Sequence, residues 1–247
     1  MTIRSPNDCN RTAIVVGGTS GFGAAITEEL RQRRFAVITV GRSADSPRGV
    51  RLHFSCDVGD LQAWDMTVGK ILEATISAKV DVLIYTVGYA RVFPFGHTPS
   101  EEWHRHLRLN LTYVAESFPY LETVLSENAS IATTGSQWSF RHGWPDLIPY
   151  ITAKHALATL TEEYAATFPQ RRFRHYCVPT MATPGYDAVR QSVIENKGTL
   201  HTLSDKSRPA DIGLISRVFV TDLLDSTVTH PVTREISAAG NLKPVGA

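Results

Sequence analysis

The feature that most constrains this sequence is a glycine-rich segment at residues 16–23, which reads VGGTSGFG. It follows a largely β-branched run at residues 13–16 and leads into apolar residues at helical spacing, namely Phe22, Ala25, Ile26 and Leu30. This order predicts a strand, a glycine turn and a helix. Because the free backbone N–H groups of a helix N-terminus attract anions, we expect the turn to bind the pyrophosphate of a dinucleotide.

The glycines of this segment have distinct expected uses, because none of them carries a Cβ. Gly17 can adopt the tight turn, Gly21 lets phosphates approach the backbone, and Gly23 lets the helix pack against the strand. A purely structural glycine loop is the alternative, but the position between the first strand and the first helix favours a dinucleotide site. The predicted cofactor-binding residues of the segment are Gly17, Thr19, Ser20, Gly21, Phe22 and Gly23.

Apolar runs alternate with helical patterns along the rest of the chain. The predicted strands are residues 13–16, 35–40, 50–55, 80–85, 130–134, 173–178 and 233–238, and a long helix is predicted at residues 153–168. This alternation predicts an α/β fold: one doubly wound, Rossmann-type domain over residues 1–247, with a parallel seven-stranded sheet flanked by helices. Residues 41–49 are too few for a usual parallel crossover, so we expect a short loop there with at most one helical turn.

Composition narrows the class of protein. Hydrophobic residues make up 43% of the chain and charged residues 20%, so we expect a sizeable core rather than disorder. The 25 Lys and Arg residues nearly balance the 24 Asp and Glu residues, which argues against nucleic-acid or anionic-membrane partners. Cys9, Cys56 and Cys177 have no metal-site spacing, and no signal or membrane-spanning pattern is present. We therefore expect a reduced cytoplasmic protein without a metal.

The end of the second predicted strand bears on the choice of dinucleotide. Residues 40–43 read VGRS and offer no carboxylate to the ribose hydroxyls of NAD. Arg42 instead supplies a fixed, forked cation suited to a 2′-phosphate, with the Ser43 hydroxyl beside it, which favours NADPH. Arg48 could serve equally well, and a solvated loop arginine is the alternative.

A tyrosine and a lysine lie at the start of the predicted helix that contains Ala153, Leu157, Leu160 and Tyr164. Tyr150 and Lys154 are four residues apart, so their side chains project from one side of the helix. An unperturbed phenol has a pKa of about 10, and an adjacent ammonium favours its phenolate, which makes the tyrosine usable for proton transfer. Ser136 follows a predicted strand at its carboxyl end, where open α/β sheets bind ligands. A chance pair and a turn serine that caps local backbone are the alternatives.

Together these motifs resemble the short-chain dehydrogenase/reductase family, in its NADP-preferring single-domain type. The glycine turn has the spacing Gly-xxx-Gly-x-Gly of that family, which also pairs such a serine with a Tyr-xxx-Lys helix. Here Ser136 lies fourteen residues before Tyr150. The resemblance runs from about residue 12 to residue 240, and the motifs occur in the family order.

The resemblance implies further site residues. Asn110 would hold a water that links Lys154 to solvent, and Asp57 with Val58 would contact the adenine, although a helix N-cap is the alternative role for Asp57. Gly88, Pro179 and Thr183 would border the cofactor, with Thr183 on the carboxamide. The chain departs from the family at residues 85–88, which read YTVG where NNAG is common, and at Thr180, which replaces a glycine.

The resemblance also implies an activity, namely hydride transfer from NADPH to a ketone. Tyr150 would donate a proton to the carbonyl oxygen, Ser136 would stabilise its developing charge, and Lys154 would lower the tyrosine pKa and hold the nicotinamide ribose. Reduction is the expected direction, because cells keep NADP mostly reduced. The alternatives are a dehydratase, epimerase or isomerase that uses bound nicotinamide, and an NADPH-sensing regulatory protein. The intact Ser136, Tyr150 and Lys154 argue against a sensor.

The expected substrate is a small molecule with a bulky or aromatic ketone. Aromatic side chains that could line its pocket, or simply pack the loops, are Phe93, Phe95, Trp138, Trp144 and Tyr186. Three basic side chains could instead meet a substrate carboxylate or phosphate, namely Arg91, Arg141 and His142. Residues 185–208 are expected to cover the substrate. The family resemblance implies a homodimer or homotetramer.

Overall fold

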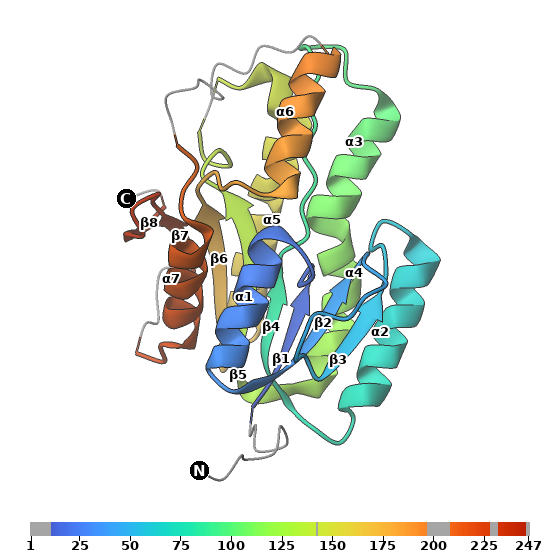
Figure 1. Ribbon diagram of the computed structural model, residues 1–247, viewed down its shortest axis with the longest axis vertical. Helices are drawn as coiled ribbons and strands as arrows, with labels where there is room; N and C mark the ends of the chain where they lie inside the picture. Colours follow the sequence, from blue (N-terminus) through green and yellow to red (C-terminus); the bar gives the residue numbers. More distant parts are fainter. Residues whose placement is uncertain (1–10, 142, 197–207, 228–231, 246–247) are drawn as a thin grey trace.

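The computed structural model describes residues 11–141, 143–196, 208–227 and 232–245. These residues form one eight-stranded sheet with helices on both of its faces (Figure 1). The strands are β1 (Arg11–Val16), β2 (Phe35–Gly41), β3 (Leu52–Ser55), β4 (Val80–Tyr85), β5 (Leu125–Ser136), β6 (Arg172–Val178), β7 (Thr233–Ile236) and β8 (Leu242–Pro244). Cys9, His142 and residues 197–207 of the predicted covering segment lie outside the described residues.

Seven α-helices lie between the strands in the described residues. They are α1 (Gly21–Gln32), α2 (Leu61–Thr75), α3 (Ser100–Leu107), α4 (Tyr113–Leu121), α5 (Ile148–Thr167), α6 (Pro184–Asn196) and α7 (Ile212–Leu224). A π-helical segment at Arg108–Thr112 joins α3 to α4, and short 3₁₀ turns at Glu122–Val124 and Pro145–Leu147 precede β5 and α5. None of the described helices is long and apolar enough to cross a membrane.

The strand order β3-β2-β1-β4-β5-β6-β7-β8 confirms the doubly wound prediction. The chain runs outward from β1 to β3 on one side and from β4 to β7 on the other, and these seven strands are parallel. Ligands of such sheets bind at the carboxyl ends of the strands where the winding reverses, here between β1 and β4. The first strand, the glycine turn and the residues after β4 therefore meet at one place.

The seven predicted parallel strands are confirmed, and the sheet has one further strand that was not predicted. β8 pairs antiparallel with β7 at the sheet edge, after a turn in which Gly240 N donates to Ser237 O. Only three residues long, β8 ends in Pro244, which lacks an N–H and is tolerated at an edge. A strand this short has no alternation of apolar and polar residues to read from the sequence.

Two apolar clusters hold the layers together, one on each face of the sheet. On one face α2, α4 and α5 cover the sheet through large buried side chains such as Trp64, Phe118 and Leu157. On the other face α1 and α7 contribute residues such as Ile26 and Phe219. β1 supplies side chains alternately to both clusters, so its residues read as a continuous apolar run.

The link between β2 and β3 is a loop with a turn at residues 48–49 and no helical turn. It can be this short because β3 lies at the sheet edge beside β2, and Arg51 N donates directly back to Val37 O. The predicted edge strand is therefore confirmed, although it begins at Leu52. α6 and the upper part of α3 stand beyond the carboxyl ends of the central strands (Figure 1).

Candidate active site

The glycine turn adopts the geometry that its sequence predicts. Gly17 has a φ of +93° and Gly21 a φ of +50°, which are conformations that favour glycine. A Cβ on Gly23 would lie 2.1 Å from Gly17 O and 2.6 Å from Thr86 Oγ1, so only glycine lets α1 begin this close to β1. Ser20 is the N-cap of α1 and makes no side-chain cap bond with any described residue. The first-turn amides are thus suited to an anion.

The departure at residues 85–88 keeps the turn in place. Thr86 N and Thr86 Oγ1 both donate to Val16 O, at 2.8 and 2.9 Å, and tie the end of β4 to the end of β1. Thr86 Oγ1 also lies beside Gly17, because a Cβ there would approach it to 2.5 Å. The threonine therefore braces the glycine turn rather than disrupting it. Tyr85 lies within the core, where its hydroxyl hydrogen-bonds Ser117 Oγ.

The predicted adenosine residues lie at the carboxyl ends of β2 and β3. Arg42 and Ser43 are exposed directly after β2. Asp57 accepts from Gly59 N at 2.9 Å and is not a helix cap, since Asp60 caps α2 by accepting from Ala63 N. The N-cap alternative for Asp57 is therefore wrong.

Val58 and Gly41 also lie at this end of the sheet. The Val58 side chain is buried in the core, so only its backbone is left to face a dinucleotide. A Cβ on Gly41 would lie 2.2 Å from Thr19 Oγ1, so this glycine makes room for the predicted site residue Thr19.

Tyr150 and Ser136 meet at the carboxyl end of β5. Tyr150 lies in the first turn of α5, directly after Pro149, which suits the start of a helix. The Tyr150 side chain is partly exposed. Burial raises the pKa of the phenol, and a hydrogen bond with the Ser136 hydroxyl lowers it by a smaller amount. The net effect keeps the phenol protonated at neutral pH, as a proton donor requires.

The turn after β5 holds Ser136 at both of its backbone groups. Ser139 N donates to Ser136 O at 2.9 Å, and Ser139 Oγ accepts from Ser136 N at 3.2 Å. Trp138 N donates to Ser136 Oγ at 3.2 Å, which leaves the hydroxyl proton free to be donated. His155 on α5 contacts Ser139 O at 3.2 Å. Because of this network, Ser136 is fixed relative to the helix that carries Tyr150.

Lys154 is buried one turn below Tyr150. Its ammonium donates to Thr134 O at 2.8 Å, and burial lowers the lysine pKa to about 8. A Cβ on Gly88 would lie 3.4 Å from Lys154 Nζ and 3.5 Å from Asn110 Oδ1, so Gly88, Lys154 and Asn110 converge. The structure thus brings together three predicted site residues from three elements.

Asn110 lies in the π-helical segment, a local helix widening that is frequent at functional sites. Its side chain is fully buried and hydrogen-bonds both backbone groups of Tyr89. Oδ1 accepts from Tyr89 N at 3.0 Å, and Nδ2 donates to Tyr89 O at 2.7 Å. Nδ2 also donates to His106 O at 2.9 Å. The carboxamide therefore fixes the segment after β4 beside Lys154.

Thr183 and Pro179 lie after β6, across from the glycine turn. A Cβ on Gly21 would lie 3.3 Å from the Thr183 side chain, so the two segments face each other at close range. Thr183 Oγ1 accepts from Tyr186 N at the start of α6, and Pro179 is buried. The departure Thr180 pairs through its carbonyl with Ala210 N at 2.8 Å.

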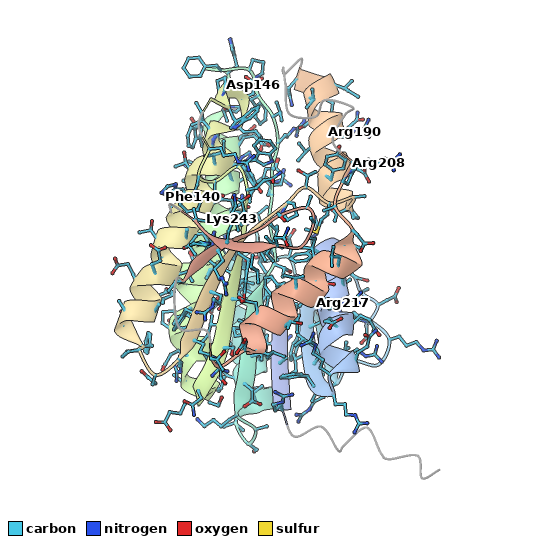
Figure 2. All side chains as sticks on the ribbon, turned by 90° about the vertical axis from the view of Figure 1, so that its left-hand side faces the viewer. Phe140, Asp146, Arg190, Arg208, Arg217 and Lys243 are labelled. Carbon is cyan, nitrogen blue, oxygen red and sulfur yellow. The ribbon has the colours of Figure 1, made fainter. Side chains whose placement is uncertain are left out.

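The segment after β4 contacts both α6 and the chain before α5: Val92 N donates to Ser192 Oγ at 3.0 Å, and Phe93 N donates to Asp146 O at 3.2 Å. Figure 2 shows Asp146 at the top of the α5 side and Arg190 on α6 at the opposite side. Trp138 and Trp144 pack edge to face with ring centroids 4.7 Å apart, whereas Phe93 is buried and Phe95 is exposed. Of the aromatic residues predicted to line a pocket, Trp138 and Trp144 pack on each other and Phe93 is buried, whereas Phe95 is exposed.

The two described basic candidates are both ion-paired. Arg91 Nη2 lies 2.8 Å from Glu195 Oε2 on α6, and Arg141 Nη2 lies 3.4 Å from Glu235 Oε1 on β7. These glutamates partly neutralise both guanidinium groups, which remain partly exposed. Among the described residues, no group of three or more His, Cys, Asp or Glu side chains could hold a metal ion.

Several residues that shape the site are missed by sequence reasoning. His175 on β6 is fully buried, and a Cβ on Gly135 would lie 2.2 Å from its Nε2, so the glycine before Ser136 makes room for the imidazole. Thr86, Ser139 and Thr134 act through backbone bonds that depend on the fold, so no spacing in the sequence identifies them.

Comparisons with known proteins agree with this arrangement. A family model described as short chain dehydrogenase matches residues 11–192. An uncharacterized oxidoreductase of Thermotoga maritima is 26% identical over 215 residues, which cover 81% of each chain. Actinorhodin polyketide ketoreductase with NADPH has a TM-score of 0.77 at 18% identity, over 97% of this chain and 100% of that chain.

A second solved structure shows what the fold leaves open. The 3-ketoacyl-(acyl-carrier-protein) reductase from Brucella melitensis, complexed with NADH, has a TM-score of 0.75 at 16% identity, over 92% of this chain and 97% of that chain. The two neighbours carry different dinucleotides on one fold, so the choice of cofactor depends on particular residues. The matched residues 11–192 include the glycine turn, Ser136, Tyr150 and Lys154. The chain belongs to the short-chain dehydrogenase/reductase family of oxidoreductases.

Proposed function

We propose that this protein is an NADPH-dependent reductase that converts a ketone to a secondary alcohol. The observation that carries the proposal is that the partly exposed Tyr150 phenol lies beside Ser136, which its turn holds in place, with Lys154 buried one turn below. These groups lie at the carboxyl ends of the strands, and the glycine turn lies at the same edge of the sheet. A sensor of dinucleotide would need no such proton donor.

Each residue of the site has a role that follows from its contacts. Tyr150 donates its phenolic proton to the carbonyl oxygen, and Ser136 donates a hydrogen bond to the same oxygen as its negative charge develops. The Lys154 ammonium favours the phenolate that remains and binds the ribose hydroxyls of the nicotinamide half. Asn110 fixes the backbone at Tyr89 and, with a bound water, connects Lys154 to solvent for replacement of the proton.

The residues present fit a dinucleotide phosphate. Phe22 and its neighbours in the first turn of α1 present backbone N–H groups, and Gly21 faces Thr183 across a gap that a Cβ would narrow. Bound NADPH supplies the hydride for the reduction. Exposed Arg42 and Ser43 after β2 support NADPH over NADH, because a guanidinium binds a phosphate through a forked pair of donors. The expected direction of reaction follows from that choice.

The substrate class follows from the walls of the site. We propose an uncharged, bulky or aromatic ketone, because Trp138 and Trp144 border the Ser136 turn while Arg91 and Arg141 are already paired with glutamates. The buried Trp144 Nε1 has no hydrogen-bond partner among the described residues, so a substrate acceptor could meet it. We further propose a cytoplasmic homodimer or homotetramer, as the family resemblance implies.

The experiment is a panel of aromatic and aliphatic ketones, with and without carboxylates, incubated with NADPH and followed at the absorbance of the reduced nicotinamide. The proposal predicts NADPH consumption that matches alcohol formation one to one, fastest with uncharged aromatic ketones. A substrate that is converted without net NADPH consumption would indicate a dehydratase, epimerase or isomerase instead. Tight NADPH binding with no turnover on any ketone would favour a regulatory protein and contradict the proposal.

A further inference from the structure

The loop between β2 and β3 is short and strongly basic. Residues 42–51 contain Arg42, Arg48 and Arg51 against one acid, Asp45, and almost all of the loop is exposed. A loop with this composition and exposure would sample many conformations unless its backbone were held. Two side chains from neighbouring elements hold it.

His53 on β3 provides the first anchor. Its Nε2 lies 2.9 Å from Ser43 O, and its Nδ1 lies 3.0 Å from Thr39 Oγ1. His53 and Thr39 are register partners on β3 and β2, so the imidazole spans the pair and reaches the chain just past the end of β2. Both bonds form together when Nε2–H donates to the Ser43 carbonyl and Nδ1 accepts from the Thr39 hydroxyl.

Arg31 on α1 provides the second anchor. Its Nε donates to Gly49 O at 2.9 Å, and Gly49 has a φ of +74°. Between the two anchors, Asp45 N donates to Ser43 Oγ at 3.1 Å and tightens the turn. The backbone is therefore fixed at residues 43 and 49, on either side of the segment that carries Arg48 and directly after Arg42.

We propose that His53 is a positioning residue for selectivity between NADPH and NADH. By holding the Ser43 carbonyl against β3, it fixes the backbone from which the Arg42 guanidinium and the Ser43 hydroxyl reach a 2′-phosphate. His53 does not touch the dinucleotide itself; it removes the need to order the loop when the phosphate binds. The inference rests on the proposed function, because it concerns the same cofactor.

The test measures binding of fragments that contain only the adenosine end of the dinucleotide. Adenosine 2′,5′-bisphosphate and 5′-AMP are titrated by calorimetry into the wild type, His53→Ala and His53→Gln. His53→Ala is expected to weaken binding of the bisphosphate about tenfold, which is about 1.4 kcal/mol, and of 5′-AMP by less than about twofold. His53→Gln retains a donor for the Ser43 carbonyl and is expected to restore most of the bisphosphate affinity.

Two further variants separate positioning from charge and from folding. Arg51→Ala removes a cation from the same loop but keeps both anchors, so it should lower bisphosphate affinity by less than about threefold, with an effect that added salt removes. Thr39→Val removes the other partner of the imidazole without changing charge and should reproduce part of the His53→Ala loss. Should His53→Ala fail to fold, the Thr39→Val and His53→Gln results decide the question alone.

The outcomes distinguish this inference from the proposed function. If the wild type binds neither fragment and neither dinucleotide, the proposed function fails. If the wild type prefers the bisphosphate and His53→Ala keeps the same ratio of affinities, only the role of His53 is overturned. An equal loss of both fragments in His53→Ala would likewise overturn it, because the imidazole would then only support the general fold of the adenosine site.

Discussion

At the scale of single residues, the proposed chemistry of the site depends on two opposed shifts of pKa. Burial raises the pKa of the Tyr150 phenol and lowers that of the Lys154 ammonium to about 8. The phenol therefore stays protonated at neutral pH, while the lysine carries its charge at pH values below about 8. A reductase needs both of these states at once, because the phenol gives its proton and the cation stabilises what remains.

Replacement of the phenol tests its role directly. Tyr150→Phe removes the proton donor and leaves the ring, so kcat for ketone reduction is expected to fall by about 10²- to 10⁴-fold while the Kd for NADPH changes little. Tyr164→Phe is the matched control, because Tyr164 lies on the same helix but stacks on Phe118 in the core. The measurement is steady-state kinetics with a dinucleotide titration of each variant. Equal losses in the two variants, or an unchanged kcat in Tyr150→Phe, would contradict the assignment.

The lysine predicts a pH dependence. As pH rises through about 8, Lys154 loses its proton, the phenolate loses its neighbouring cation, and kcat/KM for reduction is expected to decrease. Lys154→Arg keeps its charge at all these pH values and should move the decrease to higher pH, although its absolute rate will be lower. The check is a profile of kcat/KM over about four pH units, from about pH 6 to about pH 10. A profile that is flat through pH 8 in the wild type would count against a catalytic ammonium.

The sequence predicts the candidate catalytic residues but not the residues that hold them. Tyr150 and Lys154 are detectable because a fixed spacing on one helix gives them a common side. Ser139 and His53 act through bonds to the backbone of residues 136 and 43, the first within one local turn and the second only when β2 and β3 have paired. A hydrogen bond to a backbone group leaves no requirement on the identity of the partner residue, and the sequence therefore carries no signal of it.

At the scale of elements, the start of α1 depends on a close approach to β1. A Cβ on Gly23 would meet the backbone oxygen of Gly17 at 2.1 Å, and backbone cannot move aside without shifting the helix. The same shift would displace Thr86, which braces the ends of β1 and β4. The glycine turn is therefore a packing contact as well as the proposed dinucleotide site.

Gly23→Ala is expected to lower the free energy of unfolding by about 1 to 3 kcal/mol and to weaken dinucleotide binding, because α1 must move away from β1. Gly69→Ala in α2 is the matched control: a Cβ there meets nothing within 4 Å, so the helix should be stabilised by about 0.5 to 1 kcal/mol. Urea denaturation of both variants measures the difference. A Gly23→Ala protein as stable as the wild type would show that the close approach of α1 is dispensable.

Hydrophobic periodicity predicts neither the bounds of β5 nor the π-helical segment. The predicted strand at residues 130–134 extends over Leu125–Ser136, because Leu125 pairs with Val80 ahead of an irregularity in the register with β4, and Gly135 and Ser136 continue the pairing with β6. The π-helical segment at Arg108–Thr112 reads as ordinary helix in the sequence, since one widened turn leaves the apolar pattern almost unchanged. That turn nevertheless fixes the orientation of Asn110.

At the scale of the whole molecule, a buried imidazole links the sheet to α5. His175 Nδ1 hydrogen-bonds Thr133 Oγ1 at 2.8 Å, and Thr133 Oγ1 in turn lies 2.8 Å from Thr161 Oγ1. Burial, with the Lys154 ammonium nearby, lowers the His175 pKa to about 3. The imidazole is thus neutral in the folded protein at any pH at which the enzyme would work.

This buried histidine predicts a loss of stability in acid. Between pH 6.5 and about 3 the unfolded chain binds a proton on His175 that the folded protein excludes, so the free energy of unfolding falls as pH decreases, by up to about 1.4 kcal/mol per pH unit. His175→Asn removes the titrating group, and its stability should depend less on pH over this range. Chemical denaturation at a series of pH values compares the two slopes. Parallel slopes would show that His175 is not excluded from protonation.

The architecture as a whole was the most predictable part, because layered α/β folds follow from alternating apolar runs. The order of strands, the edge position of β3 and the site at the carboxyl ends all follow from that alternation and from the glycine turn. β8 was missed because three residues carry no pattern. The basic candidates Arg91 and Arg141 look free in the sequence, and only tertiary structure pairs them with Glu195 and Glu235.

The most direct test of the central claim, that this site takes NADPH, is a titration of the purified protein with NADPH and with NADH, followed by quenching of tryptophan fluorescence. Trp138 and Trp144 border the Ser136 turn and should report binding. NADPH is expected to bind at least about tenfold more tightly than NADH, a difference of about 1.4 kcal/mol. Equal or tighter binding of NADH would contradict the assignment of Arg42 to the 2′-phosphate, and binding of neither dinucleotide would contradict the proposed enzyme itself.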